Sequence, residues 1–563
     1  MAEDLVYLPL GGAGEIGMNC YLYGYGEDNR RRWIMVDLGI GFGDMETAPG
    51  VEVVVPDLEF IFERADRLDG IFLTHAHEDH VGAIPYLWER LKVPIFARPF
   101  TAEIVRRKMA ESALDIEAIR ECTLGERYEA GPFSVEFLAV THSIPEASSL
   151  AIRSPSGTVL HSGDFKLDPD PQMGAPIDMA PFEALGSEGV LALTCDSTNV
   201  FLDGVSGSEA EIIPNIERVM KSCPRAVAAT TFASNVARLR TLAVAAQNVG
   251  RTTVIVGRAM KRMTEVAVET GLLTDFPKTA SEDDAANISA ENVFYLVTGS
   301  QGENRAALAR IAAGSHPTVE LSEGDTVLFS SKTIPGNEAG IYRLYNRLSE
   351  QGIKVIDGEM ERIHVSGHAR RGDLERLYKI VRPQVAVPLH GEHRHLVEHA
   401  DLSGQWGAAH GLVAPNGTMV RLDGNAPGPV DCVEPGRVYI DGHAKIGALD
   451  GVIRERLKLA RQGQVIAALV IDEDGDLLAD PQVRCLGAPK DGEGFHMPLH
   501  DMIAEEIDDE IEGAPRKTRR TDSGIEELAA RAVRRGTGRG WGKRPGGAVV
   551  VYRLEGWTQR VEV

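Results

Sequence analysis

Long apolar runs are absent from this sequence: no stretch of about 18 consecutive apolar residues occurs in it, which excludes an ordinary membrane-spanning helix. The first ten residues, MAEDLVYLPL, also lack the basic region, apolar stretch and cleavage site of a secretory signal. We therefore expect a cytoplasmic protein with no membrane association.

Cysteine pairs and positive charge are scarce as well. The six cysteines are scattered without a CxxC pair, which argues against a zinc ribbon and a disulfide framework. Lys and Arg number 59 against 83 Asp and Glu, giving a net charge of −24. This charge argues against a general coat for nucleic acid, because phosphate binding draws on clustered positive charge. It leaves room for a nuclease, since a local basic groove reinforced by metal ions can hold a phosphate backbone.

The chain of 563 residues is too long for one core, and its pattern changes twice along the sequence. From Leu5 to about Val205, short apolar runs such as GIFLTH, FSVEFLAVTH and GTVLHSGD predict strands whose ends carry polar chemistry at one sheet edge. From about Ser206 to Glu361, buried strands alternate with amphipathic helices, which is typical of a parallel α/β domain. The first pattern returns near Arg362, so we expect the α/β unit to be an insertion.

The end of the chain has a third pattern. The segment GLVAPNGTMVRLDG is hairpin-like, and after about Asp450 a charged stretch leads to the runs VIAALVI and GAVVVYRL, which predict a small α+β domain behind a linker. The basic stretch between those runs, PRKTRRT to RGTGRGWGKRPGG, is expected to be a surface loop, either solvated or touching a nucleic acid. The predicted boundaries are 1–206 with 362–445 for the first domain, 207–361 for the insertion, 446–460 for the linker and 461–563 for the C-terminal domain.

The densest cluster of chemically active side chains is HAHEDH, residues 75–80, directly after an apolar strand. Three His and one Asp in this register arise by chance in about one in a thousand chains of this length. A loop at a strand end turns alternate side chains to opposite sides, so His75 and His77 can hold one ion while Asp79 and His80 hold another. Imidazole and carboxylate are suitable ligands for zinc or manganese. The alternative, polar surface residues of a turn, fits this spacing poorly.

Two ions need further ligands, including a shared one. His142 ends the strand FSVEFLAVT, Asp164 ends GTVLHSGD, and His390 lies in VPLHGEH. Each can reach the sheet edge that carries HAHEDH. Alone, each is more often a capped turn residue than a ligand, but together they complete the ligand sets of two ions.

This pattern, with Asp37 after RWIMV, resembles the metallo-β-lactamase superfamily. The resemblance implies an α/β protein built as an αββα sandwich with two divalent cations, zinc first, with manganese or magnesium as alternatives. The roles it implies are His75, His77 and His142 on one metal, Asp79, His80 and His390 on the other, Asp164 as the bridge, and Asp37 steadying the histidines.

The remaining motifs narrow the resemblance. Asp196 in LTCDSTN, His368 in HVSGH and His390 in PLHGE resemble the β-CASP branch, whose members are nucleases and in which a histidine at the last motif goes with RNA processing. GGAGEIGMN, FASN, TGSQGE, IPGNE and HVSGH are similar to the ribonuclease J family in particular. Met18 departs from the lysine common there. The resemblance thus implies an inserted α/β β-CASP domain and a small α+β C-terminal domain.

Hydrolysis at such a site uses a water held between two cations. The cations lower the pKa of this water towards neutrality, so that the resulting hydroxide can attack phosphorus in line. We count Asp79, His368 and Asp196 as the catalytic set. His368 would contact the scissile phosphate or donate a proton to the leaving 3′ oxygen, and Asp196 would orient it. The alternative for both is a structural role in turns.

The resemblance also implies a pocket for a 5′ monophosphate one nucleotide upstream of the cut. The sequence FASN lies where a helix should begin and HVSGH contains a glycine turn, so both can offer N–H donors to an anion. A serine at a helix start is otherwise only an N-cap. The predicted pocket residues are Ala233, Ser234, Asn235, His364, Val365, Ser366, Gly367 and His368.

The predicted function is metal-dependent hydrolysis of RNA in decay and maturation, 5′→3′ from monophosphorylated ends, with endonucleolytic cutting as a further activity. Three alternatives remain: a DNA nuclease of the same branch, a small-molecule hydrolase of lactones or thioesters, and a binding subunit with a decayed site. Expected partners are single-stranded RNA, further copies of the chain in a homodimer or homotetramer assisted by the C-terminal domain, and RNA-decay proteins. Basic residues that could follow the RNA backbone, or be solvated helix faces, are Arg258, Lys261, Arg262, Arg370 and Arg371.

Overall fold

The computed structural model describes residues 3–44, 46–334, 336–490 and 497–556, so Pro335 of the IPGNE motif and the last residues of the chain lie outside the described part. The described residues form two compact units, Met1–Gly41 with Val55–Arg437, and Phe42–Val54 with Val438–Val563. The predicted linker 446–460 overlaps a helix, α13 (Val452–Gln462), and the predicted domain boundaries stay predictions. Among the described helices, none has both the length and the apolarity to cross a membrane.

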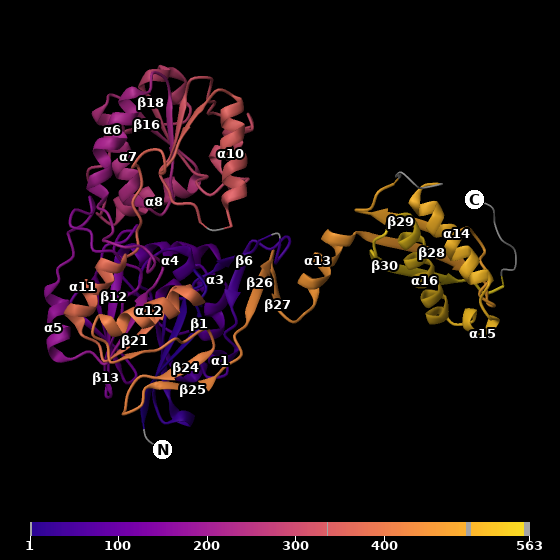
Figure 1. Cartoon of the computed structure of the whole chain (residues 1–563), viewed down its shortest axis with the longest axis horizontal. Helices are drawn as coiled ribbons and strands as arrows, with labels where there is room; N and C mark the ends of the chain where they lie inside the picture. The colour runs from indigo at the N-terminus through magenta and orange to yellow at the C-terminus, as the bar shows by residue number, and fades with distance from the viewer. Residues whose placement is uncertain (1–2, 45, 335, 491–496, 557–563) are drawn as a thin grey trace. The chain divides into compact units, whose positions relative to one another are not determined.

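Two large sheets form the lower part of the first unit in Figure 1, ordered β25-β24-β1-β3-β4-β7-β8-β9 and β10-β11-β12-β13-β14-β21-β23. The strands of the first sheet are β1 (Asp4–Gly11), β3 (Cys20–Gly26), β4 (Arg32–Val36), β7 (Leu68–Phe72), β8 (Ile95–Ala97), β9 (Ile119–Glu121), β24 (Thr418–Arg421) and β25 (Gly428–Cys432). Those of the second are β10 (Arg127–Ala130), β11 (Phe133–Ala139), β12 (Ser148–Ser154), β13 (Gly157–His161), β14 (Ala192–Asp196), β21 (Val385–Leu389) and β23 (His410–Gly411).

One hydrophobic core lies between these two sheets. Tyr7 and Phe72 enter it from the first sheet, Phe137 and Val387 from the second, and all four are fully buried. The outer face of the second sheet packs on the helices α5 (Ala180–Glu188) and α11 (Arg371–Val381), and α4 (Pro99–Glu111) contacts β8 and β9 of the first. This is the predicted αββα sandwich.

The strand register brings polar residues to one edge of the sandwich. β13, β14 and β21 are parallel neighbours, so Asp164, Asp196 and His390 lie at or just beyond their carboxyl ends. β4 and β7 are also parallel, with Val36 opposite Phe72, so Asp37 and His75 follow at the same edge. In open α/β sheets this is the edge at which ligands bind.

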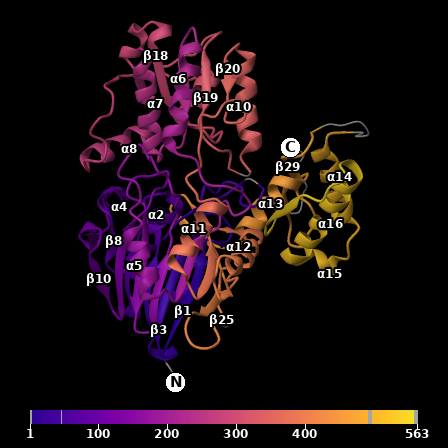
Figure 2. The same ribbon diagram turned by 60° about the vertical axis from the view of Figure 1, so that its left-hand side comes forward.

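The insertion is a parallel α/β domain, as predicted (Figure 2). Its sheet is ordered β17 (Thr279–Ala280), β16 (Thr252–Val256), β18 (Val293–Val297), β15 (Val227–Thr230), β19 (Thr326–Phe329) and β20 (Lys354–Ile356). One face packs on α6 (Ile213–Ser222), α7 (Val236–Asn248) and Met260 of α8 (Arg258–Glu269), and the other on α9 (Ala307–Ala312) and α10 (Glu338–Glu350).

The second unit ends in a small α+β domain. β28 (Gln464–Ile471) lies between β29 (Gln482–Leu486) and β30 (Gly546–Arg553), and alternate residues of β28 are buried against α14 (Leu499–Glu512) and α16 (Asp522–Gly540).

One local prediction is wrong in part and another altogether. Most of the basic stretch is helical, since it forms α15 (Arg516–Arg519) and residues 535–540 belong to α16; only residues 541–545 form a loop, before β30. In α16 the buried residues recur at helical spacing, which the Gly- and Arg-rich composition concealed; they are Ile525, Leu528, Ala529, Ala532 and Val533. GLVAPNGTMVRLDG is not a hairpin, because its two strands, β23 and β24, join different sheets: β23 pairs with β21, and β24 with β1 and β25.

Candidate metal centre

The HAHEDH loop is fixed by the segment that follows β4. Leu38 N donates to His80 O, and Ile40 N donates to Glu78 O, so the two segments run side by side. A side chain on Gly39 would clash with the backbone of Asp79, because its ideal Cβ lies 1.7 Å from Asp79 O. Glycine is therefore required at position 39 for this close approach.

Asp37 holds two parts of the loop at once. Its carboxylate accepts hydrogen bonds from Thr74 N and Oγ1, both 2.8 Å, and from His80 Nδ1 at 2.7 Å. His75 Nδ1 lies 3.0 Å from Thr74 Oγ1, whose proton is given to Asp37. Both histidines are thereby held with Nδ1 as the donor and Nε2 carrying the lone pair. Asp37 has φ 60°, a strained backbone for a non-glycine residue.

Three histidines form the first cluster of ligand atoms. His77 Nδ1 lies 2.9 Å from His75 Nε2 and 3.2 Å from His142 Nε2. His142 Nδ1 donates to Gly367 O at 2.7 Å, which leaves its Nε2 lone pair facing the cluster. Burial lowers the pKa of His77 to about 4, and those of His75 and His142 well below their usual value. These rings are therefore neutral, and the Nε2 lone pairs of His75 and His142 converge next to His77 Nδ1, as the ligand atoms of a cation do.

Asp79, His80, Asp164 and His390 form the second cluster, with ligand atoms within 4.8 Å of one another. Asp79 Oδ2 lies 3.3 Å from His390 Nε2 and 3.6 Å from His80 Nε2. In the described part of the chain, His390 Nε2 is buried and makes no hydrogen bond. His390, like Asp37, has a positive φ, 50°. A buried, unsatisfied nitrogen that faces a carboxylate oxygen at 3.3 Å fits a metal site.

The electrostatics of the second cluster also fit a cation. Burial opposes protonation of His80 and His390, but Asp164 and Asp79 outweigh it, raising the pKa of His390 to about 10 and that of His80 above its usual value. The buried carboxylates thus attract positive charge, and a divalent ion would supply it in place of protons on the two imidazoles.

Asp164 lies between the two clusters. Its Oδ2 is 3.8 Å from His75 Nε2, 3.8 Å from His142 Nε2 and 3.3 Å from His80 Nε2. Asp164 is 2% exposed. Burial alone would raise the pKa of its carboxyl, but His390 and His80 outweigh this effect and hold the pKa well below the usual range. One oxygen within reach of both ligand sets is the geometry that a bridging carboxylate needs.

Beside the clusters, His368 Nδ1 donates to Asp196 Oδ2 at 2.8 Å. Thr198 holds the other oxygen, since its N and Oγ1 donate to Asp196 Oδ1 at 2.9 and 2.7 Å. Burial would lower the pKa of His368, but the carboxylates of Asp196 and Asp164 raise it. The imidazole is therefore oriented through Nδ1, and its Nε2 remains for a substrate.

The predicted phosphate pocket is brought together only in part. A small cavity is lined by Asn235 and Val365–Gly367 together with His142, Ser143 and Lys166. Asn235 caps α7 by accepting from Arg238 N at 3.0 Å, and the N–H groups of Asn235 and Val236 bond to Phe232 and Ser234 carbonyls. Ala233, Ser234, His364 and His368 do not line this cavity. The expectation that FASN leaves its N–H donors free is therefore met only in part.

Arg238 joins the two halves of this pocket. It is fully buried, and its guanidinium donates to both oxygens of Glu209, to Ser330 and to His364 Nδ1. His364 consequently keeps its proton on Nε2, and burial and the charge of Arg238 lower its pKa well below the usual value. No sequence pattern pointed to this arginine.

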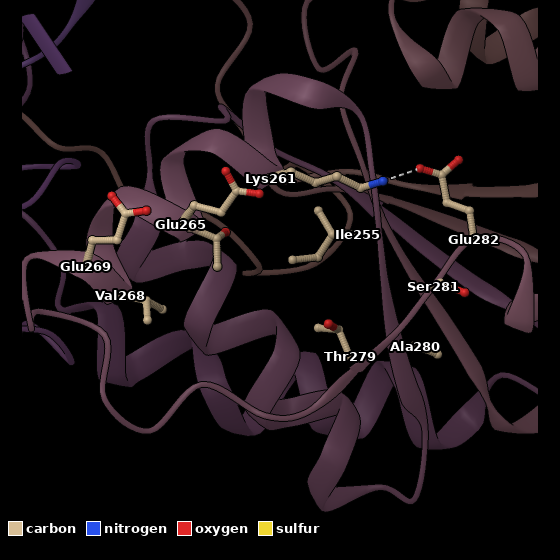
Figure 3. Close-up of a pocket in the computed structure, with 10 residues that line it drawn as sticks. Ile255, Lys261, Glu265, Val268, Glu269, Thr279, Ala280, Ser281 and Glu282 are labelled. Atoms are coloured by element: carbon tan, nitrogen blue, oxygen red, sulfur yellow. Dashed lines mark hydrogen bonds and ion pairs between the residues drawn. The ribbon is translucent and has the colours of Figure 1, made fainter. Parts of the chain in front are cut away.

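Three of the five predicted RNA-following cations are paired with carboxylates: Lys261 with Glu282, Arg262 with Glu111, and Arg371 with Glu398. Lys261 also lines a larger cavity of about 580 Å³ between α8 and residues 279–282 (Figure 3). Apart from Lys261, none of the predicted site residues lines it.

Two contacts of the site were missed from the sequence. Asn19 is fully buried, and its Nδ2 lies 3.2 Å from Asp79 Oδ2 and 2.9 Å from His80 Nε2. His390 N donates to Gly12 O at 2.6 Å. Both partners come from GGAGEIGMN, so a glycine-rich segment ending in a lone asparagine was the signal available.

Four family models match the chain. Their descriptions and residues are "Metallo-beta-lactamase superfamily" over 13–196, "Ribonuclease J, beta-CASP domain" over 224–348, "Zn-dependent metallo-hydrolase RNA specificity domain" over 352–406 and "Ribonuclease J C-terminal domain" over 451–554. The predicted fold class is confirmed.

Curated relatives match over nearly the whole chain. Ribonuclease J from Sinorhizobium meliloti is 44% identical over 98% of both chains. Ribonuclease J from Corynebacterium glutamicum is 36% identical over 88% of this chain and 69% of its own, and that from Mycolicibacterium smegmatis 34% over 95% of both. With the sandwich, the insertion and the paired ligand clusters in place, the chain belongs to the ribonuclease J family.

Proposed function

We propose that this protein is a metal-dependent ribonuclease that uses two divalent cations and degrades RNA 5′→3′ from monophosphorylated ends, with internal cutting by the same chemistry. It would act in the cytoplasm, in RNA decay and maturation alongside other decay proteins. The ribonuclease assignment follows from the family. The observation that carries the use of two cations is the position of Asp164 Oδ2, within 3.8 Å of ligand atoms in both clusters.

Seven side chains of the two clusters would bind the two cations. His75, His77 and His142 would hold one cation, Asp79, His80 and His390 the other, and Asp164 both. When bound, two such cations supply activation of a water and neutralisation of phosphate charge. The mixed imidazole and carboxylate donor set suits zinc and also accepts manganese. Asp37 would keep the lone pairs aimed inward through His80 and Thr74.

His368 would act on the substrate directly. Its Nδ1 is committed to Asp196, so a protonated Nε2 can donate to a nonbridging oxygen or to the leaving 3′ oxygen. The ring lies 4.9 Å from His142 and 5.5 Å from His390, centroid to centroid, which places it next to both clusters.

A 5′ monophosphate would bind beside His142, at the cavity that Asn235, Ser366 and Gly367 line. Buried Lys166 is a cation of this cavity, with Nζ 2.7 Å from Asp168 Oδ2 and 3.2 Å from Gly207 O, and an ammonium has one further proton to donate. An anchor at this place makes each cut release one nucleotide and regenerate the 5′ phosphate.

The test compares three single-stranded RNAs that differ only in a 5′ monophosphate, triphosphate or hydroxyl. We expect rapid release of mononucleotides from the first, and at least about tenfold slower release from the others, because a charged hydrogen-bonded contact is lost or obstructed. A matched DNA strand and a small ester serve as controls. Equal rates on all three RNAs would refute the anchor, and preferential cleavage of the DNA or ester would refute the RNA substrate.

Assembly into a homodimer or homotetramer forms part of the same proposal. The C-terminal sheet has a face that its helices leave uncovered, on which Tyr552 and Val550 of β30 are 59% and 41% exposed. They pair in register with Val470 and Ala468 of β28, so the apolar residues are continuous. A continuous apolar face suits an isologous contact with a second copy.

Sedimentation of the full chain tests this assembly. We expect a mass of two or four chains, and we expect Tyr552→Lys to shift it towards one, because the face would bury a charge. Glu555→Lys, at an exposed position nearby in the sequence, is the control. A wild-type mass of one chain would refute the proposal.

A further inference from the structure

Four side chains of the first unit form a cationic and aromatic surface beside the metal centre: Phe201, Lys332, Arg370 and Arg394, here called the platform. Phe201 is 40% exposed, which is unusual for a large aromatic side chain. The Arg394 guanidinium lies 5.0 Å from its ring centroid, and the buried His395 packs edge-on at 5.1 Å. The ring is therefore contacted by Arg394 and His395 while it remains partly accessible.

The cations of the platform are free of carboxylates. Within the described residues, no Asp or Glu oxygen lies within 4.0 Å of a charged nitrogen of Lys332, Arg370 or Arg394, on a chain whose net charge is −24. Neighbouring Arg371, by contrast, is paired with both Asp203 and Glu398. Desolvation and then the positive charge of Arg370 lower the pKa of Lys332, so these two like charges are close. Such a cluster is repulsive unless an anion binds it.

The loop that carries Lys332 is fixed by the TGSQGE motif. Gln301 Nε2 donates to Lys332 O at 3.0 Å, and Gln301 Oε1 accepts from Ile334 N at 2.9 Å. The motif thus holds the loop in one conformation. A cation on a fixed loop loses less entropy on binding than one on a mobile loop.

Asn199 connects the platform to the catalytic residues. Its Nδ2 donates to Ser366 Oγ at 2.9 Å and to His368 O at 3.1 Å, while its Oδ1 lies 3.4 Å from Lys332 Nζ. Its backbone also pairs with Arg370. Asn199 thus contacts both the platform, through Lys332 and Arg370, and the backbone of His368, so the platform lies near enough for a strand whose scissile phosphate is at the metal centre.

We propose that the platform binds the part of a single-stranded RNA that lies outside the metal centre, with a base stacked on Phe201 and phosphates held by Lys332, Arg370 and Arg394. An accessible aromatic ring offers a surface on which an unpaired base can stack, and the unpaired cations beside it can bind phosphates. These two features together suit single-stranded nucleic acid. This inference rests on the proposed function, because it adds substrate contacts to the same site.

The test uses two monophosphorylated substrates: a dinucleotide, which spans only the metal centre, and an RNA of about 12 nucleotides. We expect the single variant Phe201→Ala and the double variant Lys332→Ala/Arg394→Ala each to raise the KM for the longer RNA about tenfold. Turnover of the dinucleotide should stay unchanged, because only the longer RNA reaches the platform and loses its stacking and phosphate contacts. Phe201→Trp should restore the KM. Arg376→Ala, which removes an exposed cation from the solvent face of α11, is the matched charge control.

Binding of the same labelled RNA to the holoenzyme carrying His368→Ala gives a second measurement. Each platform cation removed should reduce the slope of log Kd against log salt by about 0.7, which a merely structural role would not do. An unchanged KM and slope in the double variant, or equal losses on both substrates, would overturn the platform. Failure of the wild type to cleave either RNA would instead overturn the proposed function, and the binding slope would still decide on the platform.

Discussion

Asp164→Asn is expected to lower RNA hydrolysis by at least about a thousandfold, because several kcal/mol of metal assistance is lost and each ~1.4 kcal/mol is a factor of ten. The substitution keeps the shape of the side chain and removes the charge that both clusters share. One oxygen of Asp164 lies within 3.8 Å of His75, His142 and His80, so both ligand sets lose a member. Metal analysis of the purified variant should find clearly fewer than the two ions per chain expected of the wild type.

Asp325→Asn is the matched control. Asp325 is also buried, at 3% exposed, but it accepts from Ala226 N and Ser322 N in the inserted domain and touches no metal candidate. The same chemical change there should leave metal content and turnover per folded chain unaltered. If Asp164→Asn kept two ions and its activity, Asp164 would not be the bridge, and the two-cation proposal would lose its central ligand.

The ligand clusters could be predicted because each residue stands where a strand ends. Parallel pairing of β13, β14 and β21 leaves no freedom in where Asp164, Asp196 and His390 emerge. The alternation of apolar residues along a strand and the polar residue that follows the strand are local patterns, so they can be recognised in the sequence. The same logic placed His75 and Asp37, through the pairing of β4 with β7.

Contacts that depend on folding could not be predicted in this way. The hydrogen bond from His142 to Gly367 O joins residues 225 positions apart. Its acceptor is a backbone carbonyl, which every residue has, so no residue type in the sequence points to it. A Cβ on Gly367 would lie 2.9 Å from the His142 ring, so glycine is needed there for packing rather than for a turn. In the sequence Arg238 looks like any other arginine of a helix. Only the folded chain brings Glu209 and Ser330 within hydrogen-bond distance of its guanidinium.

Composition also misled where helical spacing was the better guide. The RGTGRG segment belongs to the last turns of α16, where Gly536 and Thr537 are buried and Thr537 Oγ1 bonds to Val533 O. Glycine lowers helix propensity by about 1 kcal/mol, and tertiary packing of the apolar stripe on α14 outweighs it.

His368→Ala is expected to lower kcat by about a hundredfold to ten-thousandfold, the usual contribution of a positioned acid or of a donor to developing charge. The metal content should stay at two ions per chain, because the lone pair of His368 is not needed by either ligand cluster. The measurement is single-turnover cleavage of monophosphorylated RNA with metal analysis of the same sample. His500→Ala, at an exposed histidine of the C-terminal domain, is the control for losing an imidazole.

The geometry offers one rival to this role. Asp164, Asp196, His368 and His390 also bring ligand atoms within 4.8 Å of one another, so His368 and Asp196 could instead hold a cation. Asp196→Asn separates the two readings, because the amide still meets His368 but holds its ring less firmly. If His368 acts on the substrate, kcat falls about tenfold to a hundredfold with both ions retained. If it is a ligand, each variant loses an ion. Since Thr198 and His368 already occupy both oxygens of Asp196, the first outcome is the one that this arrangement of donors supports.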